Sequence, residues 1–440
     1  MSTYQQSTSI EYDLPFALGD IFRVAESGTT HQHLKNISSV IKIRGELNIE
    51  DFLKSMESLF KRQESFRTII VHSEDFLQVR FRVFENKMPD ITLFDRSKVD
   101  LKNALDEARG LASHIAQKKF SFDGSLLSRA FFFILPEKTF IVGIVTHHLI
   151  SDVLSHPIMW QELMSLYSYH HKGTQYPPDH SVQYQDYVRE RLNWQNGWKL
   201  TKDLEYWTSQ MDEFSRRSKA IDVTESVSMA IPPPVLQLYT NDQPSFADKA
   251  RHYRVTAAML VLAYFTVVLA CWGKEDTISF RIIRDERAFP RYAKLVGFLS
   301  TGRPLAINVR GNPTFEEIVA RTKSSCIEMF LHPWTPDEVL LQCRNDKSSS
   351  LFNFIYEGNE LSTFHGLEME HFGLNVAREV SSRNIFAFIY RSDSILGIAN
   401  CRPEYCFRAN LILKNMHTLM QLSIKNINVR LDELIKLMTK

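Results

Sequence analysis

Residues 128–148 read SRAFFFILPEKTFIVGIVTHH, and this stretch constrains the fold more than any other part of the chain. Two apolar runs of strand length lie on either side of a Pro-Glu-Lys turn, which predicts an antiparallel pair of strands. The second run is apolar almost throughout, as expected of a central strand that is buried on both faces. His147 and His148 therefore fall at the C-terminal end of a buried strand.

The rest of the first third of the chain mixes strand and helix periods. NISSVIKIRGELN and the two arms of RTIIVHSEDFLQVRFRVF read as strands, whereas NIEDFLKSMESLFKRQESF places apolar residues at helical spacing. A helix is expected to begin near Asp152, because apolar residues from Leu154 to Leu166 recur with a helical period. The Gly-, Pro- and Tyr-rich stretch HKGTQYPPDHSVQYQDY then breaks the pattern. We predict a first lobe over residues 1–178 and a second over 179–440.

The second lobe also mixes helices and strands. The apolar run from Val255 to Trp272 has about the minimum length of a membrane span, but it contains two threonines and lacks flanking basic clusters. It ends at Gly273 and leads into a strand-like stretch, so we predict a buried core helix. The other expected elements are a helix around NWQNGWKLTKDLEYWTSQM, a strand from Thr277, a loop with Pro290, the segment KLVGFLSTGRPLAINV, a helix from Pro313, the strand SLFNFIYEG and a final amphipathic helix.

Composition narrows the class of protein. The 440 residues are 44% hydrophobic and 23% charged, which is typical of a globular chain with two domains or one large one. Lys and Arg total 52 against 51 Asp and Glu, so charge favours neither nucleic acid nor an anionic membrane surface as a partner. The five cysteines form no C-x-x-C pair, and the first residues lack the features of a secretory leader. We expect a protein of the cytoplasm, a reducing compartment.

The sequence HHLISD at residues 147–152 contains the residue types most suited to catalysis. A neutral imidazole, with an unperturbed pKa of about 6.5, can accept a proton from an amine or a hydroxyl at neutral pH. Neighbouring side chains of an extended chain point to opposite faces, so only one histidine faces a given cleft, and we expect His147 to be a hydrogen-bonded core residue. Asp152 is either only the N-cap of the following helix or a part of the site.

Other kinds of site are disfavoured by the sequence. A metal site needs three or four ligands on one face, and the H-E-x-x-H pattern of zinc proteases is absent. The chain also has no G-x-S-x-G nucleophile motif and no G-x-x-x-x-G-K phosphate loop. We therefore expect neither a metal ion nor a bound cofactor. By itself, H-H-x-x-x-D is a modest signal for acyl transfer.

Further motifs follow one another along the chain, and together they are specific. They are RQESFRT at 62–68, FDGSLLSRAFFF at 122–133, HHLISD at 147–152, YQDYV at 184–188, YWTSQM at 206–211, LVGFLST at 295–301, HPWTPDEVL at 332–340 and RNDKSSSLF at 344–352. In this order they resemble the motifs of the condensation domain of nonribosomal peptide synthetases, within the chloramphenicol-acetyltransferase-like superfamily. The resemblance covers nearly the whole chain.

The resemblance implies an α/β fold of two chloramphenicol-acetyltransferase-like lobes, arranged as a V-shaped pseudodimer with a central tunnel. It implies that an acyl thioester arrives on the phosphopantetheine arm of an acyl or peptidyl carrier protein. His148 matches the catalytic residue of the family, which would align the acceptor, take its proton or hydrogen-bond the tetrahedral intermediate. Asp152 matches a carboxylate that forms a structural ion pair with an arginine of the other lobe, and Arg284 is the positional match.

Other positions match motif residues with a structural or tunnel-lining role, and a few depart from the pattern. The matching positions are His147, Ser155, Tyr184, Asp186, Gly297 and Ser300, although Ser300 stands where asparagine is usual. Val153 replaces a glycine that would adopt a positive φ or let a ligand pass close to the backbone. Asp337 replaces a phenylalanine. Two hypotheses follow: the tunnel is reshaped for an unusual donor or acceptor, or the domain has lost activity and serves as a docking module.

From the resemblance we expect a free-standing, monomeric condensation enzyme of natural-product biosynthesis, for example of an antibiotic or siderophore. The chain begins with Met and contains no adenylation or carrier domain, so its carrier protein would act in trans. The expected reaction forms an amide bond with a small amine or a carrier-bound aminoacyl group. The alternatives are the impaired docking module and an acyl-CoA-dependent O-acyltransferase that forms an ester with an alcohol.

Overall fold

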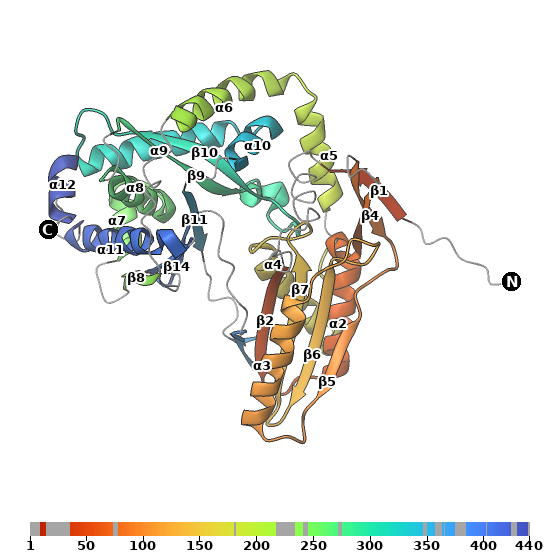
Figure 1. Ribbon diagram of the computed structural model, residues 1–440. Coiled ribbons are helices and arrows are strands. Elements are labelled where there is room, and N and C mark those ends of the chain that lie inside the picture. Colours follow the sequence, from red (N-terminus) through yellow and green to blue (C-terminus); the bar gives the residue numbers. More distant parts are fainter. Residues whose placement is uncertain are drawn as a thin grey trace. The chain divides into compact units, whose positions relative to one another are not determined.

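The computed structural model divides the chain into two compact units (Figure 1). The first unit contains Met1–Asn193, Asp285–Ser300 and Glu360–Arg378, and the second contains Trp194–Arg284, Thr301–Asn359 and Glu379–Lys440. The first unit thus continues past residue 178, where the sequence placed the boundary, and includes two segments from later in the chain. The structure describes residues 9–14, 36–73, 78–179, 182–216, 234–240, 245–271, 275–345, 350–356, 363–364, 366–374, 384–401, 403–423 and 429–438.

The first unit is built on a six-stranded sheet in which β7 (Thr139–His147) is paired on both sides. All nine residues of β7 are buried, as the apolar run predicted. Its antiparallel partner β6 (Ser128–Leu135) joins it through a turn in which Glu137 and Lys138 have φ values of 53° and 52°. The strand order is β12 (Thr363–Phe364), β13 (Leu367–His371), β2 (Asn36–Arg44), β7, β6 and β5 (Ile91–Asp95).

The alternation of side chains along these strands produces a core on each face of the sheet. On one face, Phe132 packs in a cluster with α2 (Ile49–Arg62) and α4 (Ser155–Lys172). On the other face, Phe131 packs in a cluster with α3 (Leu101–Gln117), and Figure 1 shows α3 lying along the sheet. The helices cover both faces of the sheet, so β7 is buried along its whole length. The loop that follows its C-terminal end begins at His148.

A smaller sheet and a helix complete the first unit. The strands β1 (Ser9–Asp13), β4 (Val79–Phe84) and β3 (Thr68–His72) pair in that order and are antiparallel. Helix α5 (Tyr184–Gln195) begins within the YQDYV motif, in a stretch that the sequence predicted to be a linker. The Oδ2 atom of Asp186 accepts a hydrogen bond from the backbone N–H of Gln183 at 3.0 Å, so this carboxylate stabilises the start of α5.

The second unit contains another six-stranded sheet. Its strands, in order, are β10 (Ser300–Asn308), β9 (Thr277–Asp285), β11 (Leu351–Tyr356), β14 (Ile385–Arg391), β15 (Ser394–Asn400) and β8 (Val235–Tyr239). Its helices are α6 (Lys199–Arg216), α7 (Phe246–His252), α8 (Ala257–Ala270), α9 (Phe315–Leu331), α10 (Asp337–Asn345), α11 (Cys406–Ser423) and α12 (Leu431–Met438). The sequence predicted one final helix, whereas α11 and α12 are separate; residues 424–428 between them lie outside the described part.

Helix α8 forms the centre of this second core. The ring of Phe265 lies 5.6 Å from the rings of Phe280 and Phe352 and 5.7 Å from that of Phe388, measured between centroids. The prediction of a buried core helix is therefore confirmed for Ala257–Ala270, while residues 272–274 lie outside the described part. Among the described residues no single helix has the length and apolar character needed to cross a membrane, and only the bent pair α7 and α8 meets that test, on length and composition alone.

Candidate active site

His148 lies directly after β7, in the short loop that joins this strand to α4. Its Nδ1 atom lies 2.8 Å from the carbonyl oxygen of Ser151. A carbonyl oxygen only accepts hydrogen bonds, so Nδ1 of the neutral imidazole carries the proton and the basic lone pair is on Nε2. The ring is half-buried and meets the ring of Phe298 edge to face, with centroids 4.8 Å apart at 87°. These two contacts define both the tautomer and the orientation of the imidazole.

His147 occupies the opposite environment. It is 2% exposed, and its Nδ1 atom accepts a hydrogen bond from the backbone N–H of Leu149 at 3.2 Å. Phe120 and Phe122 pack against its ring in T-shaped contacts, with centroids 6.1 and 5.2 Å away. The alternation along the strand thus places His147 in the core, as predicted, and leaves His148 as the histidine that is partly accessible.

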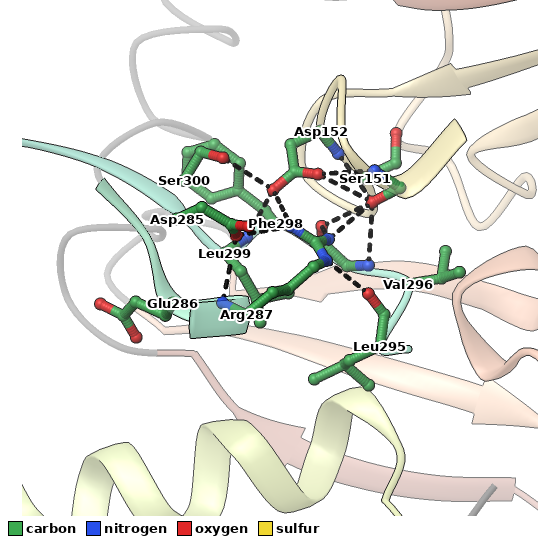
Figure 2. Close-up of polar contacts among 12 residues, drawn as sticks. Ser151, Asp152, Asp285, Glu286, Arg287, Leu295, Val296, Phe298, Leu299 and Ser300 are labelled. Carbon is green, nitrogen blue, oxygen red and sulfur yellow. Dashed lines mark hydrogen bonds and ion pairs between the residues drawn. The ribbon is translucent and has the colours of Figure 1, made fainter. Parts of the chain in front are cut away.

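Asp152 is the centre of a buried polar network (Figure 2). Its Oδ2 atom accepts hydrogen bonds from Arg287 Nη1 at 2.9 Å, from the Leu299 backbone N–H at 3.0 Å and from Ser300 Oγ at 3.0 Å. Its Oδ1 atom accepts from the backbone N–H and Oγ of Ser155, at 3.0 and 2.9 Å. Burial alone would raise the pKa of Asp152, but Arg287 and the hydrogen bonds lower it below its usual value. Asp152 therefore forms an ion pair and accepts a hydrogen bond from the first residue of α4, but the N-cap of this helix is Leu154 and not Asp152.

Arg287 connects this carboxylate to a segment far away in the sequence. Its Nε atom donates to the carbonyl oxygen of Leu295 at 2.8 Å, and Nη2 donates to that of Gly297 at 3.0 Å. Nη1 also donates to Oδ1 of Asp285 at 2.9 Å, so two carboxylates share one guanidinium. The loop that follows His148 is thereby joined to the segment Asp285–Ser300, which explains why this segment belongs to the first unit.

The prediction that Asp152 pairs with Arg284 is wrong, because its partner is Arg287. The Nη1 atom of Arg284 donates to the carbonyl oxygen of Met329 at 2.9 Å, and its guanidinium lies over the ring of Phe330, 4.8 Å from the centroid. Arg284 is still part of β9 and belongs to the second unit, whereas Arg287 lies in the 3-10 turn Glu286–Ala288 that follows this strand. Spacing alone does not distinguish two arginines three residues apart.

Gly297 is needed because an aromatic ring lies against the backbone at this point. A Cβ atom at residue 297 would lie 2.1 Å from Cδ2 of Tyr184. The hydroxyl of Tyr184 donates to the carbonyl oxygen of Phe298 at 3.1 Å. Burial raises the pKa of Tyr184, so this hydroxyl stays protonated and acts as a donor at neutral pH. The first residue of the YQDYV motif thus holds the LVGFLST segment in place.

The RQESFRT motif supports the same segment. The Oγ atom of Ser65 donates to the carbonyl oxygen of Val296 at 2.9 Å. Glu64, buried at the start of the 3-10 turn Glu64–Arg67, accepts at Oε1 from the backbone N–H of Gln185 at 2.5 Å. Burial raises the pKa of Glu64 to about 7. Three motifs that are distant in sequence therefore meet around the residues that contact His148 and Asp152.

A second buried imidazole, His156, lies in the first turn of α4 and is 5% exposed. Its Nε2 atom is 3.5 Å from Oγ1 of Thr146. Burial lowers the pKa of His156 to about 4, although the charge of Asp152 acts in the opposite direction. His156 is therefore neutral at physiological pH.

Val153 follows Asp152 in the turn before α4, and its side chain is 53% exposed. It is not among the described residues with a positive φ, so of the two reasons for a glycine at this position the positive φ does not apply to this chain. Valine fits the turn without backbone strain. Compared with a glycine at this position, Val153 adds an exposed apolar side chain to the loop that begins at His148.

The sequence did not single out Arg287, Phe298, Ser151 or Thr146. All four lie within stretches that it considered, but their roles depend on contacts across the fold. No set of three or more His, Cys, Asp or Glu residues within the described ranges is arranged to hold a metal ion. The structure shows a half-buried imidazole whose Nδ1 atom faces the carbonyl oxygen of Ser151, in a loop held by a hydrogen-bonded network. In the neutral form of this ring the basic lone pair is on Nε2. Such a group can accept a proton from a nucleophile.

Comparison with known proteins identifies the family. The family described as "Condensation domain" matches residues 22–382, and the chain belongs to it. A linear gramicidin synthase from Brevibacillus parabrevis is 26% identical over 360 residues, which are 78% of this chain and 4% of that protein. Malpibaldin synthetase from Mortierella alpina is 24% identical over 343 residues, which are 74% of this chain and 6% of that protein. The chain thus spans about a twentieth of the length of the curated relatives it matches.

Solved structures agree on the fold. The condensation domain from the monacolin K polyketide synthase MokA has a TM-score of 0.77 at 15% identity, and the match covers 96% of this chain and 99% of that one. The X-domain in its complex with OxyB from teicoplanin biosynthesis has a TM-score of 0.72 at 15% identity, and the match covers 99% of this chain and 97% of that one. The chain therefore has the mixed α/β fold of condensation domains, which is of the chloramphenicol-acetyltransferase type.

Proposed function

We propose that this chain forms an amide bond between an acyl group, held as a thioester on the phosphopantetheine arm of a carrier protein, and an amine acceptor. The acceptor is a small amine or a carrier-bound aminoacyl group. Membership of the condensation-domain family supports this class of reaction. Relatives that are peptide synthetases support a place in nonribosomal peptide or related natural-product biosynthesis.

The single observation that carries the proposal is the hydrogen bond from His148 Nδ1 to the carbonyl oxygen of Ser151. It places the lone pair of the neutral imidazole on Nε2, where it can accept a proton from the attacking amine. As the C–N bond forms and the C–S bond breaks, this proton leaves the nitrogen and the released thiolate takes one up. The imidazolium that forms in between is stabilised because the Nδ1–H donor becomes stronger when the ring is charged.

The network around Asp152 has a supporting role in this mechanism. Both carboxylate oxygens of Asp152 accept hydrogen bonds, and their donors are Arg287, Ser155, Leu299 and Ser300. We propose that Asp152 fixes the loop and is not itself a proton carrier. The lowered pKa of Asp152 supports this role, since the carboxylate stays ionised at neutral pH.

The test uses a carrier protein loaded with acyl groups of several lengths and a panel of amines and alcohols. Product is identified by mass spectrometry for the wild type, His148→Ala and His114→Ala, the last being an exposed histidine on α3. The proposal expects amide product with the wild type and His114→Ala and a loss of at least about 100-fold with His148→Ala. Equal product from His148→Ala and the wild type would show that the imidazole is not catalytic.

The same assay distinguishes the alternative reactions. Ester product from the alcohols alone, or product from acyl-CoA but not from the loaded carrier, would replace the proposed amide-forming reaction by O-acyl transfer.

A docking role is the second candidate, and one observation favours it. The X-domain of teicoplanin biosynthesis, which has this fold, was solved in complex with another protein, OxyB. A domain of this type can therefore bind a partner protein. If the wild type gives no product with any donor or acceptor but retains its fold, the docking role becomes the better account.

A further inference from the structure

A pair of buried hydroxyl groups lies directly behind the contact that orients His148. The Oγ1 atom of Thr146 lies 2.5 Å from Oγ of Ser151, the residue whose carbonyl oxygen accepts from His148 Nδ1. Thr146 is 1% exposed and Ser151 is fully buried. A hydrogen bond between two buried hydroxyls restrains both residues, because neither can exchange its partner for water.

Thr146 is anchored in the sheet rather than in the loop. It lies in the central strand β7, where it is opposite Ile37 of β2 and Ser128 of β6. Its Oγ1 atom also lies 3.4 Å from the carbonyl oxygen of Ile37 and 3.5 Å from His156 Nε2. The hydroxyl of Thr146 therefore connects the rigid sheet to the short loop that begins at His148.

We propose that Thr146 is a positioning residue for His148 and acts through Ser151. The hydroxyl pair fixes the Ser151 peptide, and its carbonyl oxygen in turn fixes the Nδ1–H tautomer and the angle of the imidazole. The proposal rests on the proposed function, in which Nε2 of His148 accepts the proton of the acceptor. Preorganised catalytic side chains depend on such supporting contacts, and their removal commonly lowers activity by about 10-fold to 100-fold.

The test compares Thr146→Val, Thr146→Ser and Ser151→Ala. Valine keeps the branched shape that suits a strand but removes the hydroxyl, and serine restores the hydroxyl. Ser151→Ala removes the other hydroxyl and keeps the carbonyl oxygen. The first readout is the ¹⁵N signal of the His148 imidazole, assigned by its loss in His148→Gln, which reports the tautomer without any substrate.

The proposal expects one Nδ1–H tautomer of His148 in the wild type and Thr146→Ser, and a mixture in Thr146→Val and Ser151→Ala. It also expects kcat to fall about 10-fold in Thr146→Val with little change in KM, and to recover in Thr146→Ser. A Thr146→Val protein that keeps a single Nδ1–H tautomer of His148 overturns the proposal, whatever its kcat. If Thr146→Val does not fold, the same comparison is made with Ser151→Ala.

The two readouts separate this proposal from the proposed function. If the wild type forms no product, the proposed function fails, and the positioning role still stands or falls on the nitrogen signals. If the wild type is active but its tautomer is unchanged in both hydroxyl-deleted variants, the positioning role fails alone.

Discussion

The Oδ2 atom of Asp152 and the Nη1 atom of Arg287 lie 2.9 Å apart, and the two side chains are only 2% and 5% exposed. Asp152 lies in the loop that begins at His148, and Arg287 lies in the segment Asp285–Ser300, so the pair joins two parts of the chain separated by 135 residues. A buried ion pair costs much to desolvate and stabilises a fold only when its remaining hydrogen bonds are made, as they are here. Its value to this protein is the fixed position of the loop that carries His148.

Replacing Arg287 with alanine should reduce the free energy of unfolding by about 3 to 5 kcal/mol, because Asp152 would be left charged and buried. Urea denaturation measures the change. The matched control is Arg291→Ala, whose ion pair with Glu190 is exposed and should be worth at most about 1 kcal/mol. If Arg287→Ala costs no more than Arg291→Ala, the ion pair is not the support described here.

Replacing Gly297 with alanine should destabilise the protein by about 1 to 3 kcal/mol, since the new Cβ would meet the ring of Tyr184. Gly110 in α3 provides the control, because a Cβ there has nothing within 4 Å and alanine favours a helix by up to about 1 kcal/mol. Thermal unfolding should therefore move in opposite directions for the two variants. A Gly297→Ala protein as stable as the wild type would contradict the close packing of Tyr184.

His156 should make the protein less stable in acid. Its pKa is about 4 in the folded chain against 6.5 in the unfolded chain, so between these values only the unfolded chain binds the proton. The free energy of unfolding should fall, by an amount of the order of 3 kcal/mol, as the pH decreases from about 6.5 to 4. Denaturation at a series of pH values should show this slope in the wild type and a smaller one in His156→Gln.

The contribution of Glu64 to the free energy of unfolding changes with pH in the opposite direction to that of His156. Its pKa is raised from 4.5 to about 7, so its contribution is present at low pH and is lost as the pH rises through about 7. Comparing the wild type with His156→Gln removes this effect, because Glu64 is present in both. Equal slopes in the two proteins would mean that His156 is not kept neutral by burial.

Replacing Val153 with glycine should change the choice of acceptor more than the overall stability. The residue has no positive φ and its side chain is exposed, so glycine relieves no strain and should cost at most about 1 kcal/mol. Removing an exposed apolar group from the loop of His148 should alter the ratio of kcat/KM between bulky and small amines. Equal increases in kcat/KM for every acceptor would instead indicate a partly degraded site.

The sequence predicted the elements whose patterns are local. The apolar run of β7, the alternation that separates His147 from His148, and the predominantly apolar helix α8 all follow from the sequence pattern, and the structure confirms them. The formation of these elements depends on the burial of apolar side chains, and this burial leaves a clear pattern of apolar residues along a strand or helix.

The parts that the sequence missed depend on contacts between distant residues. The segment Asp285–Ser300 was expected in the second lobe, yet the bonds from Arg287 and Tyr184 place it in the first unit. The sequence predicted Arg284 as the partner of Asp152 and did not consider Arg287, because spacing does not show where β9 ends. At Val153 the resemblance to the family called for a glycine. The backbone at this residue has no positive φ, so the turn accommodates valine.

The most direct test of the account is the rate of a single turnover with a carrier protein that bears the acyl group and an amine that the wild type accepts. Rapid quenching measures the rate constant for the wild type, His148→Ala and His114→Ala at neutral pH. The account predicts that His114→Ala matches the wild type and that His148→Ala is slower by at least about 100-fold. A rate constant for His148→Ala within about threefold of the wild type would contradict the central claim that His148 takes the proton of the acceptor.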